Sequence, residues 1–88
     1  MPQKMMSVKM AFNKKEDWEN FLGIIDDRQN MYDTWDEWHE AYLKLKNQLI
    51  SEGFEVIDVE VDLNKLAKYC RSKGIKIDGK ARSQFVQE

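Results

Sequence analysis

Residues 33–61, DTWDEWHEAYLKLKNQLISEGFEVIDVEV, decide the fold of this chain. Their first half repeats apolar side chains at the three- and four-residue spacing of one helical face. The stripe consists of Trp35, Trp38, Tyr42, Leu45 and Leu49, with Leu43 and Ile50 widening it. Asp33 is a suitable N-cap and Gly53 a suitable C-terminal stop. The pattern predicts one long amphipathic helix between Asp33 and Glu52.

A strand is predicted directly after this helix, over residues 54–61. From residue 57 to 61 apolar residues alternate with acidic ones, which is typical of a strand with one buried face. Phe54 and Val56 have the opposite phase. Either a bulge shifts the register near Val56, or both faces of the strand are covered at that end.

Weaker signals on either side complete the element order. Residues 5–12 alternate as a strand, and Trp18, Phe21, Leu22 and Ile25 share one face of a helix that Asn13 can cap. Asp62 caps a predicted helix over residues 63–73, which Gly74 ends, and Asp78 caps a short last helix. Between these two helices, residues 75–77 form a short extended piece that can add an edge strand.

The predicted fold class is therefore α+β, in the order β-α-α-β-α-α, as a single domain over residues 1–88. We expect a small sheet of two or three strands, packed on one face by two or three helices. Two strands alone make a marginal sheet. A third strand, a helical cover or a second subunit extending the sheet would each stabilise it, and we expect the helical cover, with dimerisation as an addition.

Composition indicates a globular protein of the cytoplasm. Of the 88 residues 42% are hydrophobic and 34% charged, with three Trp, three Tyr and four Phe, which is too aromatic for a disordered chain. Cys70 is the single cysteine, so an intramolecular disulfide is impossible. No apolar run has the ~20 residues that a membrane helix needs, and Lys9 interrupts the start of the chain where a signal peptide would be apolar.

Charge is distributed unevenly along the chain. Residues 1–62 hold 7 Lys and Arg against 14 Asp and Glu, whereas residues 63–88 hold 7 against 2, so the two parts carry −7 and +5. One interpretation is internal complementarity, in which the basic segment packs against the acidic body. The other is an anionic partner, nucleic acid above all. The candidate anion-binding residues are Lys65, Lys68, Arg71, Lys73, Lys76, Lys80 and Arg82.

The basic segment does not match a helix-turn-helix motif. Six residues separate Ala67 from Gly74, too many for the ~3–4-residue turn of that motif. The acidity of the whole chain also disfavours DNA binding, since neutralisation of phosphates dominates that affinity.

Catalytic chemistry finds little support. His39 is the single histidine, and a metal site around it would need Asp36 and Glu40 as further ligands. A nucleophilic dyad would need Cys70 within hydrogen-bond reach of His39, but Cys70 falls on the predicted inner face of its helix. We predict no catalytic residue, no metal and no cofactor, and the sequence favours a non-enzymatic protein.

An aromatic surface is the favoured candidate site. Trp18, Tyr32, Trp35 and Trp38 cluster around the segment before the long helix, and a domain of this size has difficulty covering all of them. Any part left exposed would bind a partner or a second copy of the chain.

The closing stretch resembles short bacterial proteins of unassigned function. The residues that carry the resemblance are Tyr69-Cys70, Gly74 and Asp78-Gly79-Lys80-Ala81-Arg82-Ser83-Gln84-Phe85, together with the Trp-rich helix before a Gly-Phe-x-Val strand. The resemblance implies a bacterial cytoplasmic protein and carries no activity or catalytic residue.

Three hypotheses of function follow. The favoured one is a small interaction module that associates with itself through the aromatic helix or a sheet edge. The second is a nucleic-acid-binding accessory protein that uses the basic C-terminal third. The third, least supported, is a small enzyme or metal protein around His39 or Cys70.

Overall fold

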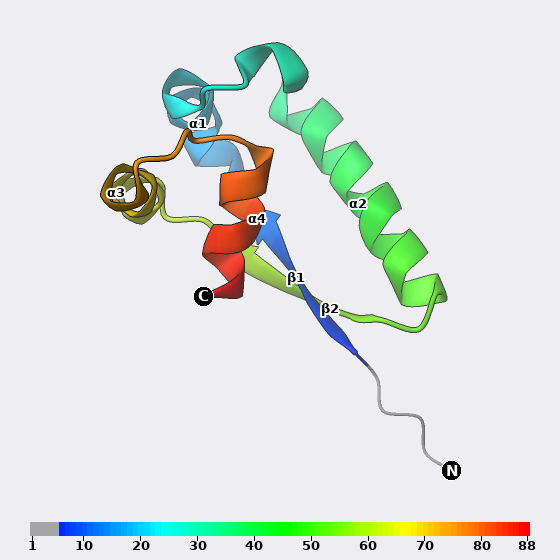
Figure 1. Ribbon diagram of the computed structural model, residues 1–88. Helices are drawn as coiled ribbons and strands as arrows, with labels where there is room; N and C mark the ends of the chain where they lie inside the picture. The colour runs from blue at the N-terminus through cyan, green and yellow to red at the C-terminus, as the bar shows by residue number, and fades with distance from the viewer. Residues whose placement is uncertain (1–5) are drawn as a thin grey trace.

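The computed structural model describes residues 6–88, and within them the α+β class and the element order are confirmed (Figure 1). Met5, at the start of the first expected strand, lies outside the described residues. The elements are β1 (Ser7–Phe12), η1 (Lys15–Asp17), α1 (Trp18–Ile24), η2 (Arg28–Asn30), α2 (Trp35–Ser51), β2 (Glu55–Glu60), α3 (Leu63–Lys73) and α4 (Gly79–Gln87).

β1 and β2 pair in parallel and form a two-stranded sheet. The register runs without interruption from Ser7 opposite Glu55 to Phe12 opposite Glu60. No bulge therefore occurs near Val56. Cover on both faces at that end, the other explanation considered above, is not found either, because Val56 is half-buried but Ile57, on the opposite face, is 38% exposed.

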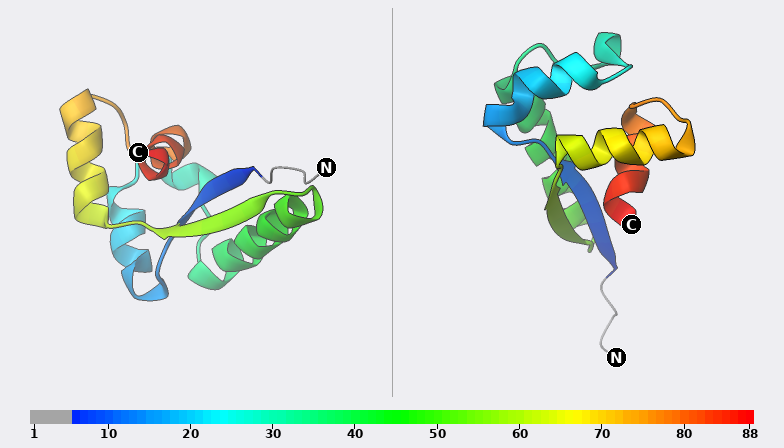
Figure 2. Two further views of the ribbon diagram at one scale, coloured as in Figure 1. Left: turned by 90° about the horizontal axis from the view of Figure 1, so that it is seen from below. Right: turned by 90° about the vertical axis from the view of Figure 1, so that its left-hand side faces the viewer.

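Helices lie on both faces of the sheet, rather than on the single face that the sequence indicated (Figure 2). α2 packs on one face, where Met10 and Phe12 of β1 meet its aromatic residues. α4 packs on the other face, where Ala11 and Val59 contact buried residues of α3 and α4. The reason is local: Met10 and Phe12 share one phase and Ala11 and Val59 the other, and successive side chains of a strand point to opposite faces.

The core consists of two hydrophobic clusters. The first joins α1 to the beginning of α2 and contains Trp18, Phe21, Ile25, Trp38 and Tyr42. The second joins α3 to α4 and contains Val61, Leu66, Cys70, Ala81 and Val86. Leu63 and Ile77 pack against both clusters and so connect them. Neither strand contains a fully buried residue.

Two helix starts differ from the sequence-based expectation. α2 is capped by Thr34 instead of Asp33, because the Thr34 Oγ1 accepts the Glu37 N–H at 3.2 Å. Asn13 caps no helix; it is buried at the end of β1, and its Oδ1 has no hydrogen-bond partner in the described part of the chain. The other expected ends are found, and Gly74 ends α3 in the left-handed region at φ 65°.

Residues 75–77 do not add a third strand to the described sheet. Ile77 is held instead by Asp26: its N–H donates to the Asp26 carboxylate at 2.8 Å, and its carbonyl accepts the Asp26 N–H at 2.8 Å. This pair of bonds fixes the connection between α3 and α4 against the end of α1.

Candidate functional site

The expected aromatic surface is mostly core. Trp18 and Trp38 are buried, with 6% and 9% of their surface exposed, and their rings lie 5.9 Å apart between α1 and α2. Of the four candidate residues, only Tyr32 is exposed and Trp35 half-buried. Trp18 and Trp38 are therefore not part of an exposed surface, in contrast to what the sequence suggested.

Trp35 is held from three directions. Its Nε1–H donates to the carbonyl of Asn13 at 2.7 Å, its ring stacks on His39 with centroids 4.3 Å apart, and Lys15 Nζ lies 5.6 Å above the ring. These contacts fasten the start of α2 to the end of β1. They also occupy His39, so both Trp35 and His39 have structural partners.

The basic residues of the C-terminal third separate into paired and unpaired groups. Arg82 is buried and its guanidinium donates to both carboxylate oxygens of Asp27, at 2.9 and 3.0 Å. Lys73 Nζ lies 3.9 Å from a Glu88 oxygen. The remaining candidates are exposed and form no ion pair among residues 6–88; they are Lys65, Lys68, Arg71, Lys76 and Lys80.

Internal complementarity accounts for little of this charge. Of the seven basic candidates, Arg82 alone forms an ion pair with a residue of the acidic part, as far as the described residues go. The acidic start of α2 lies on the opposite side of the sheet from α4 (Figure 2). Packing of the basic segment against the acidic helix is therefore not how this fold arranges its charges.

The outer edge of β2 is a surface that sequence reasoning missed. The Glu55 N–H donates to the Met6 carbonyl and the Val61 N–H to the Phe12 carbonyl. Alternate residues of a strand direct their backbone hydrogen bonds to the same neighbouring strand. The N–H and C=O groups of the odd-numbered residues of β2 therefore point toward β1. The N–H and C=O groups of Val56, Asp58 and Glu60 therefore point outward, away from β1.

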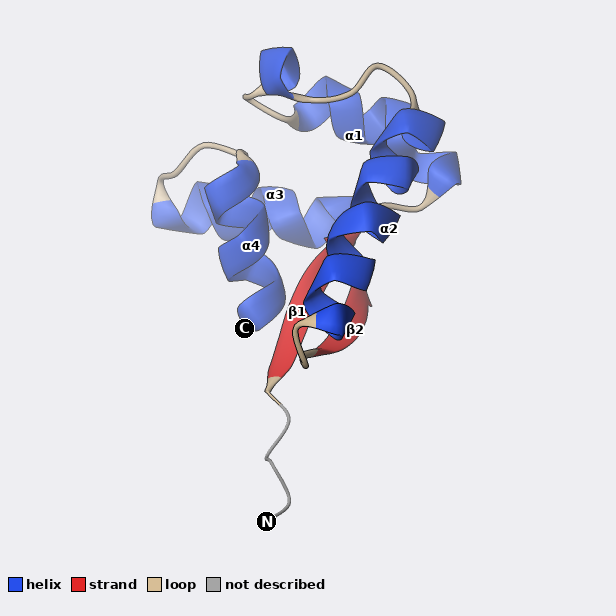
Figure 3. Cartoon of the chain, turned by 90° about the vertical axis from the view of Figure 1, so that its right-hand side faces the viewer, coloured by secondary structure: helices blue, strands red, loops and turns tan. Residues whose placement is uncertain are grey.

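Exposed apolar side chains flank this edge. Figure 3 shows α2 running in front of the sheet, with β2 on one side of it and β1 on the other. We call the side of α2 nearer to β2 its β2 flank and the side nearer to β1 its β1 flank. A helix turns about 100° per residue, which places Leu43 and Ile50 on the β2 flank and Leu45 on the β1 flank. Leu43 and Ile50 are 41% and 50% exposed, and Ile57, on the opposite face of β2, is 38% exposed.

Among residues 6–88, Asp58 is the one acidic residue of β2 that forms an ion pair. Lys46 Nζ donates to one carboxylate oxygen at 2.7 Å, and the Tyr42 hydroxyl donates to the other. The Lys46 hydrogen bond, followed by that of Tyr42, holds the pKa of Asp58 below its usual range. These bonds attach α2 to β2, whereas Glu55 and Glu60 have no ion-pair partner within residues 6–88.

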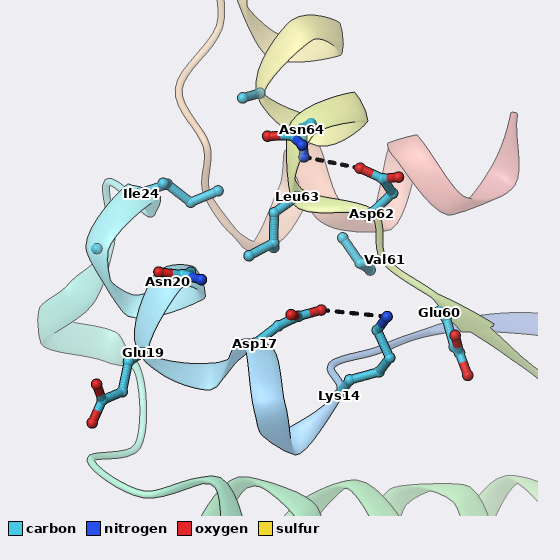
Figure 4. A pocket seen from close by; sticks show the side chains of 12 residues that line it. Lys14, Asp17, Glu19, Asn20, Ile24, Glu60, Val61, Asp62, Leu63 and Asn64 are labelled. Atoms are coloured by element: carbon cyan, nitrogen blue, oxygen red, sulfur yellow. Dashed lines mark hydrogen bonds and ion pairs between the residues drawn. The ribbon is translucent and has the colours of Figure 1, made fainter.

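A polar cleft of about 720 Å³ opens at the carboxyl ends of the two strands (Figure 4). α1 and the first turn of α3 form its sides, and Ile24, Val61 and Leu63 supply apolar surface. Lys14 and Asp17 lie 3.6 Å apart within one turn of its lining, and the Asp62 carboxylate accepts the Asn64 N–H at 3.0 Å. Its lining is more acidic than basic. Nowhere in residues 6–88 do three His, Cys, Asp or Glu side chains gather to hold a metal ion.

His39 and Cys70 do not form a catalytic pair. His39 stacks on Trp35 beside the first cluster, whereas Cys70 is buried within the second. Burial raises the pKa of the Cys70 thiol, which disfavours the nucleophilic thiolate. The proposed dyad is therefore absent from the fold.

The function of this chain has to be inferred from its fold and its surfaces, because comparisons with known proteins provide no match. No family model, curated protein or solved structure matches the chain. In the part of the chain that the structure describes, no helix combines the length and the apolar character needed to span a membrane.

Proposed function

We propose that this protein is a non-enzymatic interaction module that works as a homodimer joined through the outer edge of β2. The observation that carries the proposal is the outer edge of β2, which pairs with no other strand of residues 6–88, together with Leu43, Ile50 and Ile57, which expose apolar surface beside it. A two-stranded sheet is marginal by itself, and pairing with a second copy would give four strands. A cytoplasmic location and a single domain over residues 1–88 are parts of the same proposal.

Antiparallel pairing of β2 with β2 of a second copy has one register that suits its charges. With the two-fold axis at Ile57, this residue lies opposite itself, Glu55 opposite Val59, Asp58 opposite Val56 and Glu60 opposite Phe54. No carboxylate then faces another directly, which avoids the destabilisation of like charges in cross-strand pairs. The closest acidic pair is the diagonal one between the two Asp58 side chains, and each of these has Lys46 as its partner.

The same two-fold axis brings the two α2 helices side by side on one face of the merged sheet. Their β2 flanks then face each other, so Leu43 and Ile50 of both copies meet. On the other face the two Ile57 side chains pack together, because α4 lies mainly over β1 and Ile57 is 38% exposed. The interface is isologous and closed, which is the commonest symmetry of homo-oligomers.

The other edge of the sheet is already occupied. α4 lies against β1, and Gln87 Nε2–H donates to the Lys9 carbonyl at 3.1 Å, which covers an outward-facing acceptor. Edge strands protected in this way resist pairing with another chain. The aromatic start of α2 is likewise a weaker interface, since Trp18 and Trp38 are buried in the monomer.

A matched pair of α2 variants tests the dimer. Ile50 and Leu45 are 50% and 49% exposed, but they lie on opposite flanks of the helix. We expect wild type and Leu45→Lys to be dimers by light scattering at about 100 μM, a concentration at which a micromolar Kd gives mostly dimer. Ile50→Lys should be a folded monomer. A monomeric wild type, or an Ile50→Lys variant that remains dimeric, would refute the proposed interface.

A further inference from the structure

A shallow hollow of about 380 Å³ lies on the α4 face of the sheet, the face on which α4 packs. Val59 of β2, Tyr69 of α3 and Phe85 of α4 give it apolar walls. Lys9 of β1 and Lys65 of α3 line it as well. The hollow therefore includes part of β2, the strand through which we propose that two copies of the chain join.

The two lysines are the charges of this hollow that have no counter-ion. Neither Lys9 nor Lys65 forms an ion pair within residues 6–88. Two acidic residues of the lining have partners already: the Asp62 carboxylate caps α3, and the Glu88 carboxylate accepts a hydrogen bond from the Tyr69 hydroxyl at 3.1 Å. An acidic group that enters the hollow from outside would therefore find a free cation there.

Glu55 carries the complementary charge on the same face of the sheet. Ala11 and Val59 lie opposite each other in the sheet and pack against buried residues of α3 and α4. Since alternate residues of a strand share a face, Glu55 also projects on the α4 face, whereas Glu60 projects on the face of α2. Glu55 is exposed and forms no ion pair in the described part of the chain. Within its own chain it lies at the far end of β2 from the hollow.

The proposed dimer brings Glu55 of each copy to the hollow of the other. With the two-fold axis at Ile57, Glu55 of the second copy lies opposite Val59. The two residues form a non-hydrogen-bonded pair, the kind in which side chains approach most closely. Val59 lines the hollow together with Lys65. We therefore propose that Glu55 of each copy forms an ion pair with Lys65 of the other, an inference that rests on the homodimer proposed above.

This ion pair selects the register of the two β2 strands. A shift of the second copy by two residues in one direction puts its Glu55 opposite Ile57, farther from Lys65. The same shift in the other direction puts Asp58 opposite Asp58, and like charges directly opposite are destabilising. Lys9 contributes less, because it lies beside Ile57 on β1, with β2 between it and the second copy. Lys65 is therefore the residue of the hollow that recognises the second copy.

Reversal of the charges tests the ion pair. One exposed ion pair changes an equilibrium by roughly twofold. Because the dimer is symmetric, Glu55→Lys or Lys65→Glu removes two attractions and adds two repulsions, so either variant should raise the dimer Kd roughly 20-fold. Glu55→Lys/Lys65→Glu restores both pairs and should return the Kd to within about threefold of wild type. Sedimentation equilibrium at about 50 mM salt, where screening is weak, measures each Kd.

Lys76→Glu is the matched control. It makes the same change of charge as Lys65→Glu at an exposed residue outside the hollow, and it should leave the Kd within about twofold of wild type. Lys65→Glu places a negative charge in the first turn of α3, where the helix dipole favours it, so this variant should remain folded.

The outcomes separate the ion pair from the dimer itself. If the wild type is a dimer but the double variant associates no more tightly than the single variants, the β2 interface stands and the ion pair is wrong. Equal Kd values for Lys65→Glu and Lys76→Glu would also overturn the ion pair. A monomeric wild type would overturn both proposals.

Discussion

The Arg82–Asp27 ion pair offers the sharpest test of how this fold is held together. Arg82 is 8% exposed, donates two hydrogen bonds to the Asp27 carboxylate and lies 5.4 Å from the centroid of the Phe21 ring. It joins α4 to the end of α1 across 55 positions of sequence. The substitution Asp27→Ala would leave the guanidinium buried without its counter-charge.

The expected cost follows from burial. Removing one partner of a buried pair costs roughly 3–5 kcal/mol, and the 17% exposure of the Asp27 side chain argues for the lower end, about 3 kcal/mol. For a domain of this size that corresponds to a fall in Tm of roughly 12 °C or more. Arg82→Met in the same chain should recover part of the loss, because it removes the unpaired charge and keeps the apolar contact with Phe21.

The exposed Arg28–Asp33 ion pair supplies a matched comparison for the buried Arg82–Asp27 pair. Arg28 and Asp33 form an ion pair of similar length, 2.8 Å against 2.9 Å, but their side chains are 44% and 84% exposed. Asp33→Ala should therefore cost only about 0.5 kcal/mol. Urea unfolding of both alanine variants measures the difference. If Asp27→Ala cost no more than Asp33→Ala, or if adding Arg82→Met made Asp27→Ala still less stable, the account of a buried pair would be wrong.

Three further predictions concern pH, the thiol and one glycine. Arg82 holds the pKa of Asp27 below its usual value of about 4, so the stability that the pair contributes is complete above about pH 4 and is lost as pH falls through the folded pKa. In urea unfolding at decreasing pH from about pH 6, the free energy of unfolding of Asp27→Asn should therefore fall less steeply than that of wild type. Cys70 should react with a thiol reagent far more slowly in the folded protein than in denaturant, because it is 1% exposed and its pKa is raised by burial; equal rates would place it at the surface. Gly74→Ala should destabilise by about 1–2 kcal/mol through its positive φ, although a Cβ meets nothing within 4 Å, whereas Gly23→Ala inside α1 should be neutral or stabilising; similar thermal shifts for the two would contradict this reason.

Local periodicity explains why the long helix and the strand after it could be predicted. α2 and β2 follow each other directly, and each has an apolar spacing that suits only its own element. The error at the helix start has a local cause as well, since Asp33 and Thr34 are both cap-forming residues. Only the backbone geometry decides between them, and it selects Thr34.

Contacts between distant residues could not be predicted in the same way. Asp26 holds Ile77 over 51 positions and so removes residues 75–77 from the sheet, and nothing near either residue indicates the other. The burial of Trp18 has the same origin, because it depends on where α1 comes to rest against α2. The rings of Trp18 and Trp35 both lie within about 6 Å of Trp38, but whether such a group faces the core or solvent is a property of the packed elements.

The exposure of Leu43, Leu45 and Ile50 on α2 follows from the width of the sheet. Neighbouring strands lie about 5 Å apart, whereas a helix with its side chains is about 10 Å across, so two strands are narrower than the apolar stripe above them. Leu45 and Ile50 both belong to that stripe in the sequence, and each is about half exposed because the sheet ends beneath it. The two flanks differ in what lies below: β1 has α4 and Gln87 against it, but β2 has no covering element on its outer edge in the described structure. Because the apolar stripe of α2 is wider than the two-stranded sheet beneath it, it matches a sheet that is extended on the β2 side. A four-stranded sheet would cover the flank of α2 that carries Leu43 and Ile50.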